Sequence, residues 1–266
     1  MQPSRRPRLG LLVALTTLAL LSAAPAAAQD IKALLKQSRG SVFLLRLFDA
    51  SGLEVGSGTG FLVQEGVVVT NDHVVEPASR IAVVVSDERT VDALGVIARD
   101  PDNDLALLKV PALGVPPLPV ETSATLEPGD RIIVLGNPLG LSGTVSDGIV
   151  AALRPQGLGP ESRDFFEKTP LVQITAPISS GSSGSPVLNS RGAVVGVAVS
   201  QYVYGQNLNF AIPADSLIAL MARRPLDQLE SPLAAAGQAD RWVYLRNLGI
   251  SAAVFVAIFL ALRRLK

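Results

Sequence analysis

The 266-residue chain contains no cysteine and a single histidine, His73. Without cysteine the chain forms no disulfide, and one histidine is too few for an ordinary structural zinc site. Lysine and arginine together number 23, as do aspartate and glutamate, and no basic run marks the central region. Nucleic-acid binding therefore has little support, and we expect no metal, no cofactor and no nucleic-acid partner.

Hydrophobic residues make up 48% of the chain, which is enough for one or two domains with their own cores. Many fall in short runs separated by turn residues, a pattern that predicts β-strands. Short helices are expected at 31–37 and 214–222, and a proline-rich crossing at 111–119 divides the strands into two groups. The first group is 42–48, 60–63, 67–70, 81–85, 91–98 and 105–110, and the second is 131–135, 144–153, 171–175, 186–188, 193–200 and 208–212.

His73, Asp104 and Ser183 follow one another in the order found in chymotrypsin-like double barrels. A serine hydroxyl is a poor nucleophile near neutral pH unless a base accepts its proton and a third group orients that base. Histidine suits the role of base because its ordinary pKa of about 6.5 lets it accept and return a proton within one cycle. We expect Ser183 to be the nucleophile, His73 the base and Asp104 the orienting carboxylate.

Ser183 lies in a stretch rich in glycine and serine, Gly181-Ser182-Ser183-Gly184-Ser185-Pro186. Sharply turned backbone favours residues without a Cβ, so the amides of Gly181 and Ser183 are expected to point together at a developing oxyanion. The alternative is a plain loop that joins two strands. The upstream histidine and aspartate, in the right order, favour the nucleophile loop.

Several blocks of the sequence together resemble the protease domain of the HtrA (DegP-like) family of trypsin-fold serine proteases. The blocks are GSGTGFLV at 56–63, VTNDHVV at 69–75, DPDNDLALLKV at 100–110, LGNPLG at 135–140 with VSDGIV at 145–150, and NFAIP at 209–213. The resemblance implies an all-β, chymotrypsin/trypsin-like fold of two six-stranded β-barrels, at about 40–110 and 130–213, within a protease domain at 29–222. It also implies polypeptide substrates, and it leaves open a homotrimer or a regulatory partner.

The chain departs from the family pattern in two respects. Ser182 and Ser185 stand where the family commonly has asparagine and glycine around the nucleophile. The family usually carries PDZ domains after the protease domain, and we expect none here because about 50 residues after Pro213 are too few. In trypsin-fold enzymes the residue six before the nucleophile lies at the base of the specificity pocket, and here it is Pro177. The resemblance therefore implies small or aliphatic residues before the scissile bond, not basic ones.

Both ends of the chain carry hydrophobic segments. Three arginines, an apolar run at 9–21 and the triplet at 26–28 predict a cleaved signal peptide at 1–28, with a retained anchor as the alternative. An uncharged run at 248–262, between aromatic and basic residues, predicts a transmembrane anchor at 242–266, preceded by a linker at 223–241. A helix lying on the membrane surface is the other interpretation of this run. The expected location is a single-pass protein of the cytoplasmic membrane, with the protease domain periplasmic or extracellular and the C-terminus cytoplasmic.

The predicted function is that of a membrane-anchored serine endopeptidase, acting in periplasmic protein quality control or in regulated proteolysis. The main alternative is a non-catalytic or latent, membrane-tethered module on the same fold that binds extended peptides or acts like a chaperone. An esterase using the same three residues lacks a G-x-S-x-G elbow, because Ser185 stands two residues after Ser183.

Overall fold

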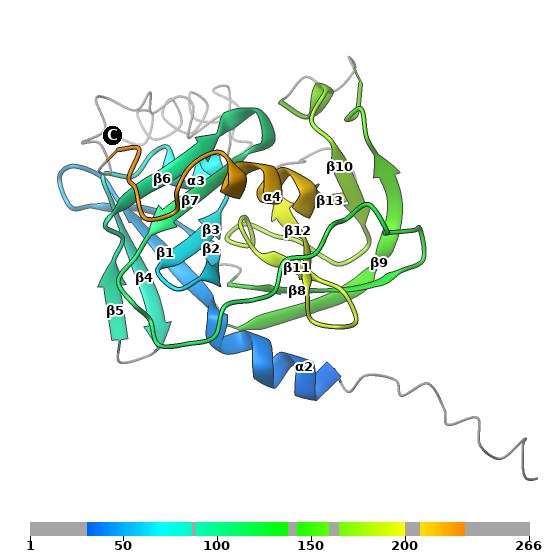
Figure 1. The fold of residues 1–266 in the computed structure, drawn as a ribbon, viewed down its shortest axis with the longest axis horizontal. Helices are drawn as coiled ribbons and strands as arrows, with labels where there is room; N and C mark the ends of the chain where they lie inside the picture. Colours follow the sequence, from blue (N-terminus) through cyan, green and yellow to red (C-terminus); the bar gives the residue numbers. More distant parts are fainter. Residues whose placement is uncertain (1–30, 87–88, 138–142, 160–164, 200–207, 232–266) are drawn as a thin grey trace, which may run out of the picture.

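The computed structural model describes residues 31–86, 89–137, 143–159, 165–199 and 208–231. Its strands form two β-sheets, one in each half of the domain (Figure 1). The N-terminal half is a seven-stranded sheet, and the C-terminal half is a closed barrel of six strands. The all-β, two-part architecture expected of a trypsin-like fold is confirmed.

The seven-stranded sheet has the order β5-β4-β1-β2-β3-β7-β6, and each neighbouring pair is antiparallel. Its strands are β1 (Val42–Phe48), β2 (Glu54–Gln64), β3 (Val67–Thr70), β4 (Arg80–Ser86), β5 (Arg89–Asp92), β6 (Gly95–Asp100) and β7 (Leu105–Lys109).

The closed barrel has the order β10-β13-β12-β11-β8-β9. Its strands are β8 (Arg131–Gly136), β9 (Thr144–Arg154), β10 (Leu171–Ile174), β11 (Pro186–Leu188), β12 (Val194–Val199) and β13 (Asn209–Pro213). The six-stranded barrel predicted for the second half is therefore present, with strand ends within about two residues of those expected.

The first half differs from the six-stranded barrel that the sequence predicts. The run at 91–98, expected as one strand, is divided between β5 and β6, which lie at opposite edges of the sheet. At the division the amide of Ala93 donates to Ile81 O on β4 at 2.9 Å, and the amide of Leu94 donates to Lys109 O on β7 at 2.7 Å. The sheet curls until its edges meet at these two residues, and among the described strands β5 does not pair with β6.

Strands β3 and β7 are buried on both faces. Val67 and Val69 of β3 belong to one hydrophobic cluster, and Val68 between them belongs to another. Leu107 and Leu108 of β7 divide in the same way, because successive side chains of a strand point to opposite faces. The first cluster continues into the barrel through Ile133, Leu135, Leu171, Val197 and Phe210. The two halves thus share an apolar core, and β3 and β7 form its wall in the first half.

The α-helices within the described residues are α2 (Ile31–Ser38), α3 (Asp72–Val75) and α4 (Ala214–Ala222). Helices α2 and α4 lie where the sequence predicts them, and α3 is one turn that the sequence does not predict. Helix α4 buries Leu217 and Leu220 in the cluster that joins the two halves. The described 3₁₀ helices are η1 (Arg39–Ser41), η2 (Pro101–Asn103) and η4 (Phe165–Glu167).

After α4 the chain returns to the first half and packs beside β6. The amide of Glu230 donates to Val96 O at 2.8 Å, and the amide of Val96 donates to Ser231 O at 2.9 Å. Leu229 fills the space over Gly95, where an added Cβ would lie 3.0 Å from its Cδ1 atom. Within the expected linker, residues 229–231 therefore lie against the sheet.

The predicted signal peptide at 1–28 and the predicted anchor at 242–266 lie outside the described residues. Within the described ranges, no helix combines the length and the apolar character needed to cross a bilayer.

Candidate active site

His73 and Asp104 lie beside the ends of two paired strands. Strand β3 ends at Thr70, which is paired with Ala106 near the start of β7. His73 follows β3 in the single turn of α3, and Asp104 directly precedes β7. Antiparallel pairing thus brings the two residues together. His73 Nδ1 lies 2.7 Å from Asp104 Oδ2, and the backbone N–H of His73 donates to Asp104 Oδ1 at 2.9 Å.

The backbone of Asp104 is held in the left-handed region. Among the described non-glycine residues it alone has a positive φ, 48°, a conformation that aspartate tolerates better than most side chains. Its carbonyl accepts a hydrogen bond from Asn71 Nδ2 at 2.8 Å, and its amide donates to Pro101 O at 3.3 Å. Since such a conformation persists only where the surroundings impose it, these bonds fix the direction of the Asp104 carboxylate.

The turn before Asp104 is tied to the C-terminal helix. Asp100 is 4% exposed at its side chain and accepts from Asn103 Nδ2 at 2.9 Å and from Arg223 Nη2 at 2.6 Å. Ser216 Oγ of α4 also donates to Asn103 Oδ1 at 3.3 Å. Side chains from the end of the domain therefore support the loop that carries Asp104.

The surroundings of His73 favour its protonated form. Burial by itself lowers the pKa of His73, but the attraction and hydrogen bond of Asp104, with smaller contributions from Asp72 and Glu76, outweigh it. The pKa of His73 is therefore raised above its ordinary value of 6.5. An imidazole of this kind is a stronger base than a free one and is stabilised once it has taken up a proton.

Ser183 lies in the loop between β10 and β11, with 6% of its surface exposed. Its carbonyl accepts a hydrogen bond from the amide of Thr59 on β2 at 2.9 Å, so the loop is fixed to the first half. Gly184 has a φ of 83°, and a Cβ at this position would lie 2.1 Å from Thr59 O. The glycine after Ser183 is therefore required by a close approach as well as by its backbone conformation.

Gly58 brings the Ser183 loop next to the helix that carries His73. A Cβ at Gly58 would lie 2.8 Å from Val74 Cγ1 and 3.6 Å from Ser183 O. The backbone of Ser183 and the residue after His73 thus pack around the same glycine. Among the described residues, no hydrogen bond joins the Ser183 hydroxyl to the His73 ring.

Of the five backbone amides at 181–185, two have no acceptor among the described residues, and they are those of Gly181 and Ser183. The other three amides between 181 and 185 each donate to a backbone carbonyl at 2.9–3.0 Å. Buried backbone amides without a partner are rare in proteins. The pair is available to a ligand oxygen, which is the property that an oxyanion site requires.

Pro177, the residue expected at the base of the specificity pocket, is exposed in the segment that leads from β10 to this loop. The next residue, Ile178, has its amide 3.3 Å from Asn209 Oδ1 on β13. The role of Pro177 in specificity stays a prediction.

Two residues that contact this site were not singled out from the sequence, Thr59 and Arg99. Thr59 Oγ1 donates to Gly181 O at 2.8 Å, and Arg99 forms an ion pair with Asp72, next to His73. Thr59 lies within one of the family-like blocks, but its partner is 122 positions away in the chain. Pairings at such separations carry no local sequence signal.

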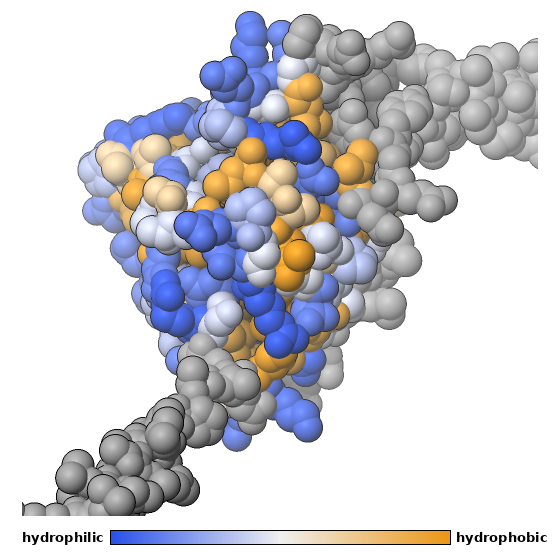
Figure 2. All heavy atoms as spheres, turned by 90° about the vertical axis from the view of Figure 1, so that its right-hand side faces the viewer, coloured by the Kyte–Doolittle hydropathy of each residue, from blue (hydrophilic) through white to orange (hydrophobic). Residues whose placement is uncertain are grey.

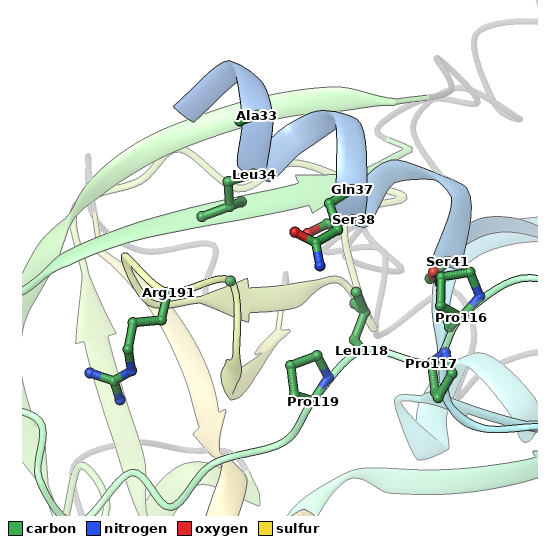
Figure 3. Close-up of a pocket in the computed structure, with 11 residues that line it drawn as sticks. Ala33, Leu34, Gln37, Ser38, Ser41, Pro116, Pro117, Leu118, Pro119 and Arg191 are labelled. Atoms are coloured by element: carbon green, nitrogen blue, oxygen red, sulfur yellow. Dashed lines mark hydrogen bonds between the residues drawn. The ribbon is translucent and has the colours of Figure 1, made fainter. Parts of the chain in front are cut away.

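A pocket lies between α2 and the connection that joins the two halves (Figure 3). None of the predicted site residues lines it, and within the described ranges no group of three acidic or histidine side chains could hold a metal ion. Its walls are Ala33, Leu34, Gln37, Ser38, Ser41, Pro116, Pro117, Leu118, Pro119, Arg191 and Gly192.

The face at the right of Figure 1 mixes apolar and hydrophilic residues (Figure 2). On β9, Ile149 and Leu153 are both 42% exposed. Single exposed aliphatic residues of this kind are normal on protein surfaces, so they do not mark a binding face.

Comparison with known proteins agrees with this geometry. The chain is 38% identical over 171 residues to the "Putative serine protease HhoA" of Synechocystis sp., covering 62% of this chain and 42% of that protein. It is 40% identical over 179 residues to the "Probable periplasmic serine endoprotease DegP-like" of Chlamydia muridarum, covering 65% of this chain and 34% of that protein. The chain thus spans less than half the length of these curated relatives.

Solved structures give the same result for the fold. The structure "HtrA-type protease AlgW with tripeptide" superposes with a TM-score of 0.62 at 26% identity, covering 71% of this chain and 61% of that one. The "Crystal structure of the serine endoprotease from Yersinia pestis" superposes with a TM-score of 0.60 at 25% identity, covering 74% and 66%. HtrA-type serine proteases are therefore structural neighbours as well as homologues.

The family described as "Trypsin-like peptidase domain" matches residues 58–197, more than half of the chain. This range includes the expected histidine, aspartate and serine together with Thr59. The chain therefore belongs to the trypsin-like peptidase family.

Proposed function

We propose that this chain is a serine endopeptidase that cleaves polypeptides through an acyl-enzyme, with Ser183, His73 and Asp104 as its catalytic residues. The observation that carries the proposal is the 2.7 Å contact between His73 Nδ1 and Asp104 Oδ2. A carboxylate at that position keeps the proton on Nδ1 and leaves Nε2 as the basic nitrogen of the ring.

In the proposed reaction, Ser183 Oγ attacks the carbonyl carbon of the scissile bond while its proton passes to His73. The C–N bond then breaks, and His73 returns the proton to the leaving amine. Water, deprotonated by His73, then attacks the remaining ester. The ester C–O bond breaks, His73 returns the proton to Ser183 Oγ, and the carboxylic acid is released. The amides of Gly181 and Ser183 would bind the oxyanion in both steps, each lowering the barrier by about 3 kcal/mol.

The substrate class proposed is extended or unfolded polypeptide. The relatives are described as serine proteases and endoproteases, and one structural neighbour holds a tripeptide. With Pro177 in place of an acidic residue before the nucleophile, a small or aliphatic residue is proposed at the cleavage position. A strand-like peptide would lie along the loop of Ser183 by main-chain hydrogen bonding.

An exported location is proposed, and the relatives described as periplasmic support it. The signal peptide at 1–28 and the membrane anchor at 242–266 remain part of this proposal. An anchor after residue 231 would hold the protease domain close to the membrane surface, so nearby membrane proteins and misfolded chains would be its substrates.

A latent form of the same fold is the second candidate. It is favoured by one observation, which is that the Ser183 hydroxyl makes no hydrogen bond to the His73 ring among the described residues. In free enzymes such bonds are often long and tighten only in the complex with substrate, so this observation does not oppose catalysis.

Labelling with a fluorophosphonate probe, which reacts covalently with activated serines, tests the proposal. We expect the native protein to be labelled and both Ser183→Ala and His73→Ala to abolish labelling. Ser182→Ala is the matched control, because Ser182 is in the same loop and is also 6% exposed. Labelling that survives in Ser183→Ala would contradict the assignment of the nucleophile. A native protein that stays unlabelled, even with unfolded casein present, would favour the latent module.

A further inference from the structure

Thr59 is a buried threonine on β2 whose hydroxyl forms hydrogen bonds in two directions. Its Oγ1 donates to Gly181 O at 2.8 Å and accepts from the amide of Asn137 at 3.0 Å. Gly181 precedes the proposed nucleophile by two residues, and Asn137 follows the end of β8. A single hydroxyl of the first half therefore joins two separate segments of the second half.

The backbone of Thr59 holds the same loop at a second point. Its amide donates to Ser183 O at 2.9 Å, and its carbonyl accepts from Thr70 Oγ1 at 2.8 Å on the neighbouring strand β3. The carbonyls of Gly181 and Ser183 are thus both bonded to Thr59. They lie on either side of the peptide group that carries the Ser183 amide, so the orientation of that group is fixed from both sides.

These contacts bear directly on the amides of Gly181 and Ser183, which have no acceptor among the described residues. An amide can stabilise an oxyanion only if it already points at the reacting oxygen, because reorienting it during the reaction would cost the energy that it supplies. The Gly181 carbonyl is the freer of the two bonded carbonyls, since Gly181 has a φ of 88° and no side chain to restrict it. The Thr59 hydroxyl supplies that restriction.

We propose that Thr59 is a positioning residue that holds the amides of Gly181 and Ser183 in the orientation needed for oxyanion binding. This inference rests on the proposed function. Thr59 differs from the triad residues in its effect, because loss of its hydroxyl would reduce the stabilisation of the transition state and leave the basicity of His73 unchanged. Valine has the shape of threonine without the hydroxyl, so Thr59→Val separates hydrogen bonding from packing, and Thr59→Ser restores the hydrogen bond alone.

The test compares Thr59→Val, Thr59→Ser and Ser41→Ala with the native protein. Ser41 is the matched control, because it is fully buried and donates its hydroxyl to a backbone carbonyl, that of Pro116, outside the proposed site. The measurements are the rate constant for fluorophosphonate labelling, and kcat and KM on fluorescent casein from pH 5 to 9. We expect Thr59→Val to lower the labelling rate and kcat about tenfold, somewhat less than the loss of a direct oxyanion donor, with KM and the pH profile unchanged.

Thr59→Ser is expected to recover most of the lost rate, and Ser41→Ala is expected to match the native protein. The proposal is overturned if Thr59→Val reacts at the native rate, if serine gives no recovery, or if Ser41→Ala slows the reaction equally. Amide hydrogen exchange at 137 and 179–185 is measured in parallel and does not depend on activity. Faster exchange at these amides in Thr59→Val, and not in the other variants, supports the positioning role even if the native protein is unlabelled. Absence of labelling of the native protein would refute only the proposed function. Unchanged exchange would refute the positioning role.

Discussion

Arg99 forms a two-point ion pair with Asp72, the residue immediately before His73. Arg99 Nε lies 2.5 Å from Asp72 Oδ1, and Arg99 Nη2 lies 2.9 Å from Asp72 Oδ2. The Asp72 side chain is 9% exposed, and burial raises its pKa despite the opposing effect of the guanidinium. His73 therefore has a second carboxylate nearby in addition to Asp104, and Arg99 partly neutralises it.

The first prediction concerns pH dependence. Because the pKa of His73 is raised, the acid limb of kcat/KM should have its midpoint above pH 6.5, since the neutral imidazole is the active base. Asp72 is one of the groups that raise this pKa, so Asp72→Asn should move the midpoint to lower pH. The control is Asp92→Asn, which removes an exposed carboxylate paired with Arg80 and should leave the profile in place. A midpoint that stays fixed or rises in Asp72→Asn would contradict this account of the site.

A second prediction separates the orienting role of Asp104 from its structural role. Asp104→Asn should keep the fold, because asparagine also tolerates the left-handed conformation and retains an oxygen for the backbone N–H of His73. The kcat should nevertheless fall by about 10⁴, since an amide no longer holds the imidazole in the productive tautomer. Asp102→Asn, an exposed change two residues earlier, should leave kcat unaltered. Equal kinetics for the two variants would remove Asp104 from the mechanism.

A third prediction concerns the glycine after the nucleophile. Gly184 and Gly52 have nearly the same φ, 83° and 82°, but a Cβ at Gly52 meets nothing within 4 Å. Gly52→Ala should lower the free energy of unfolding by about 1–2 kcal/mol, the usual cost of a left-handed alanine. In Gly184→Ala the new Cβ would also lie 2.1 Å from Thr59 O, so the free energy of unfolding should fall by about 4 kcal/mol or more. Urea unfolding measures both, and similar midpoints would argue against the tight packing of this loop.

A fourth prediction concerns the ion pair between Arg223 and Asp100, which supports the turn before Asp104. Arg223→Ala should reduce the free energy of unfolding by about 1–2 kcal/mol, because Asp100 is buried while the half-exposed arginine is partly screened. Arg131→Ala is the control, since its pair with Asp147 is exposed on both sides and should contribute less than about 0.5 kcal/mol. High salt should reduce only slightly the difference between the two variants in their loss of unfolding free energy. Equal losses would mean that the Arg223 contact is an ordinary surface pair.

The sequence alone could predict the strands and the candidate site residues because both depend on local patterns. Strand β3 at 67–70, strand β11 at 186–188 and helix α4 at 214–222 have the predicted bounds. Turn residues and a proline mark their ends, and such signals act within a few residues. The run at 91–98 failed as one strand although Asp92 and Gly95, residue types common in turns, flank the point where Ala93 and Leu94 cross between the edges of the sheet. That crossing depends on distant carbonyls, those of Ile81 and Lys109.

Composition and local pattern are enough to establish that the chain is mostly β-structure, that one histidine is available as a base, and which aspartate and serine could accompany it. How these groups are held depends on the packing of the folded chain. The pairing of β3 with β7 brings His73 to Asp104, and Thr59 reaches Gly181 across 122 positions of chain. Side-chain periodicity and turn residues are local properties, whereas a hydrogen bond between the two halves exists only after both have folded and packed on their shared core.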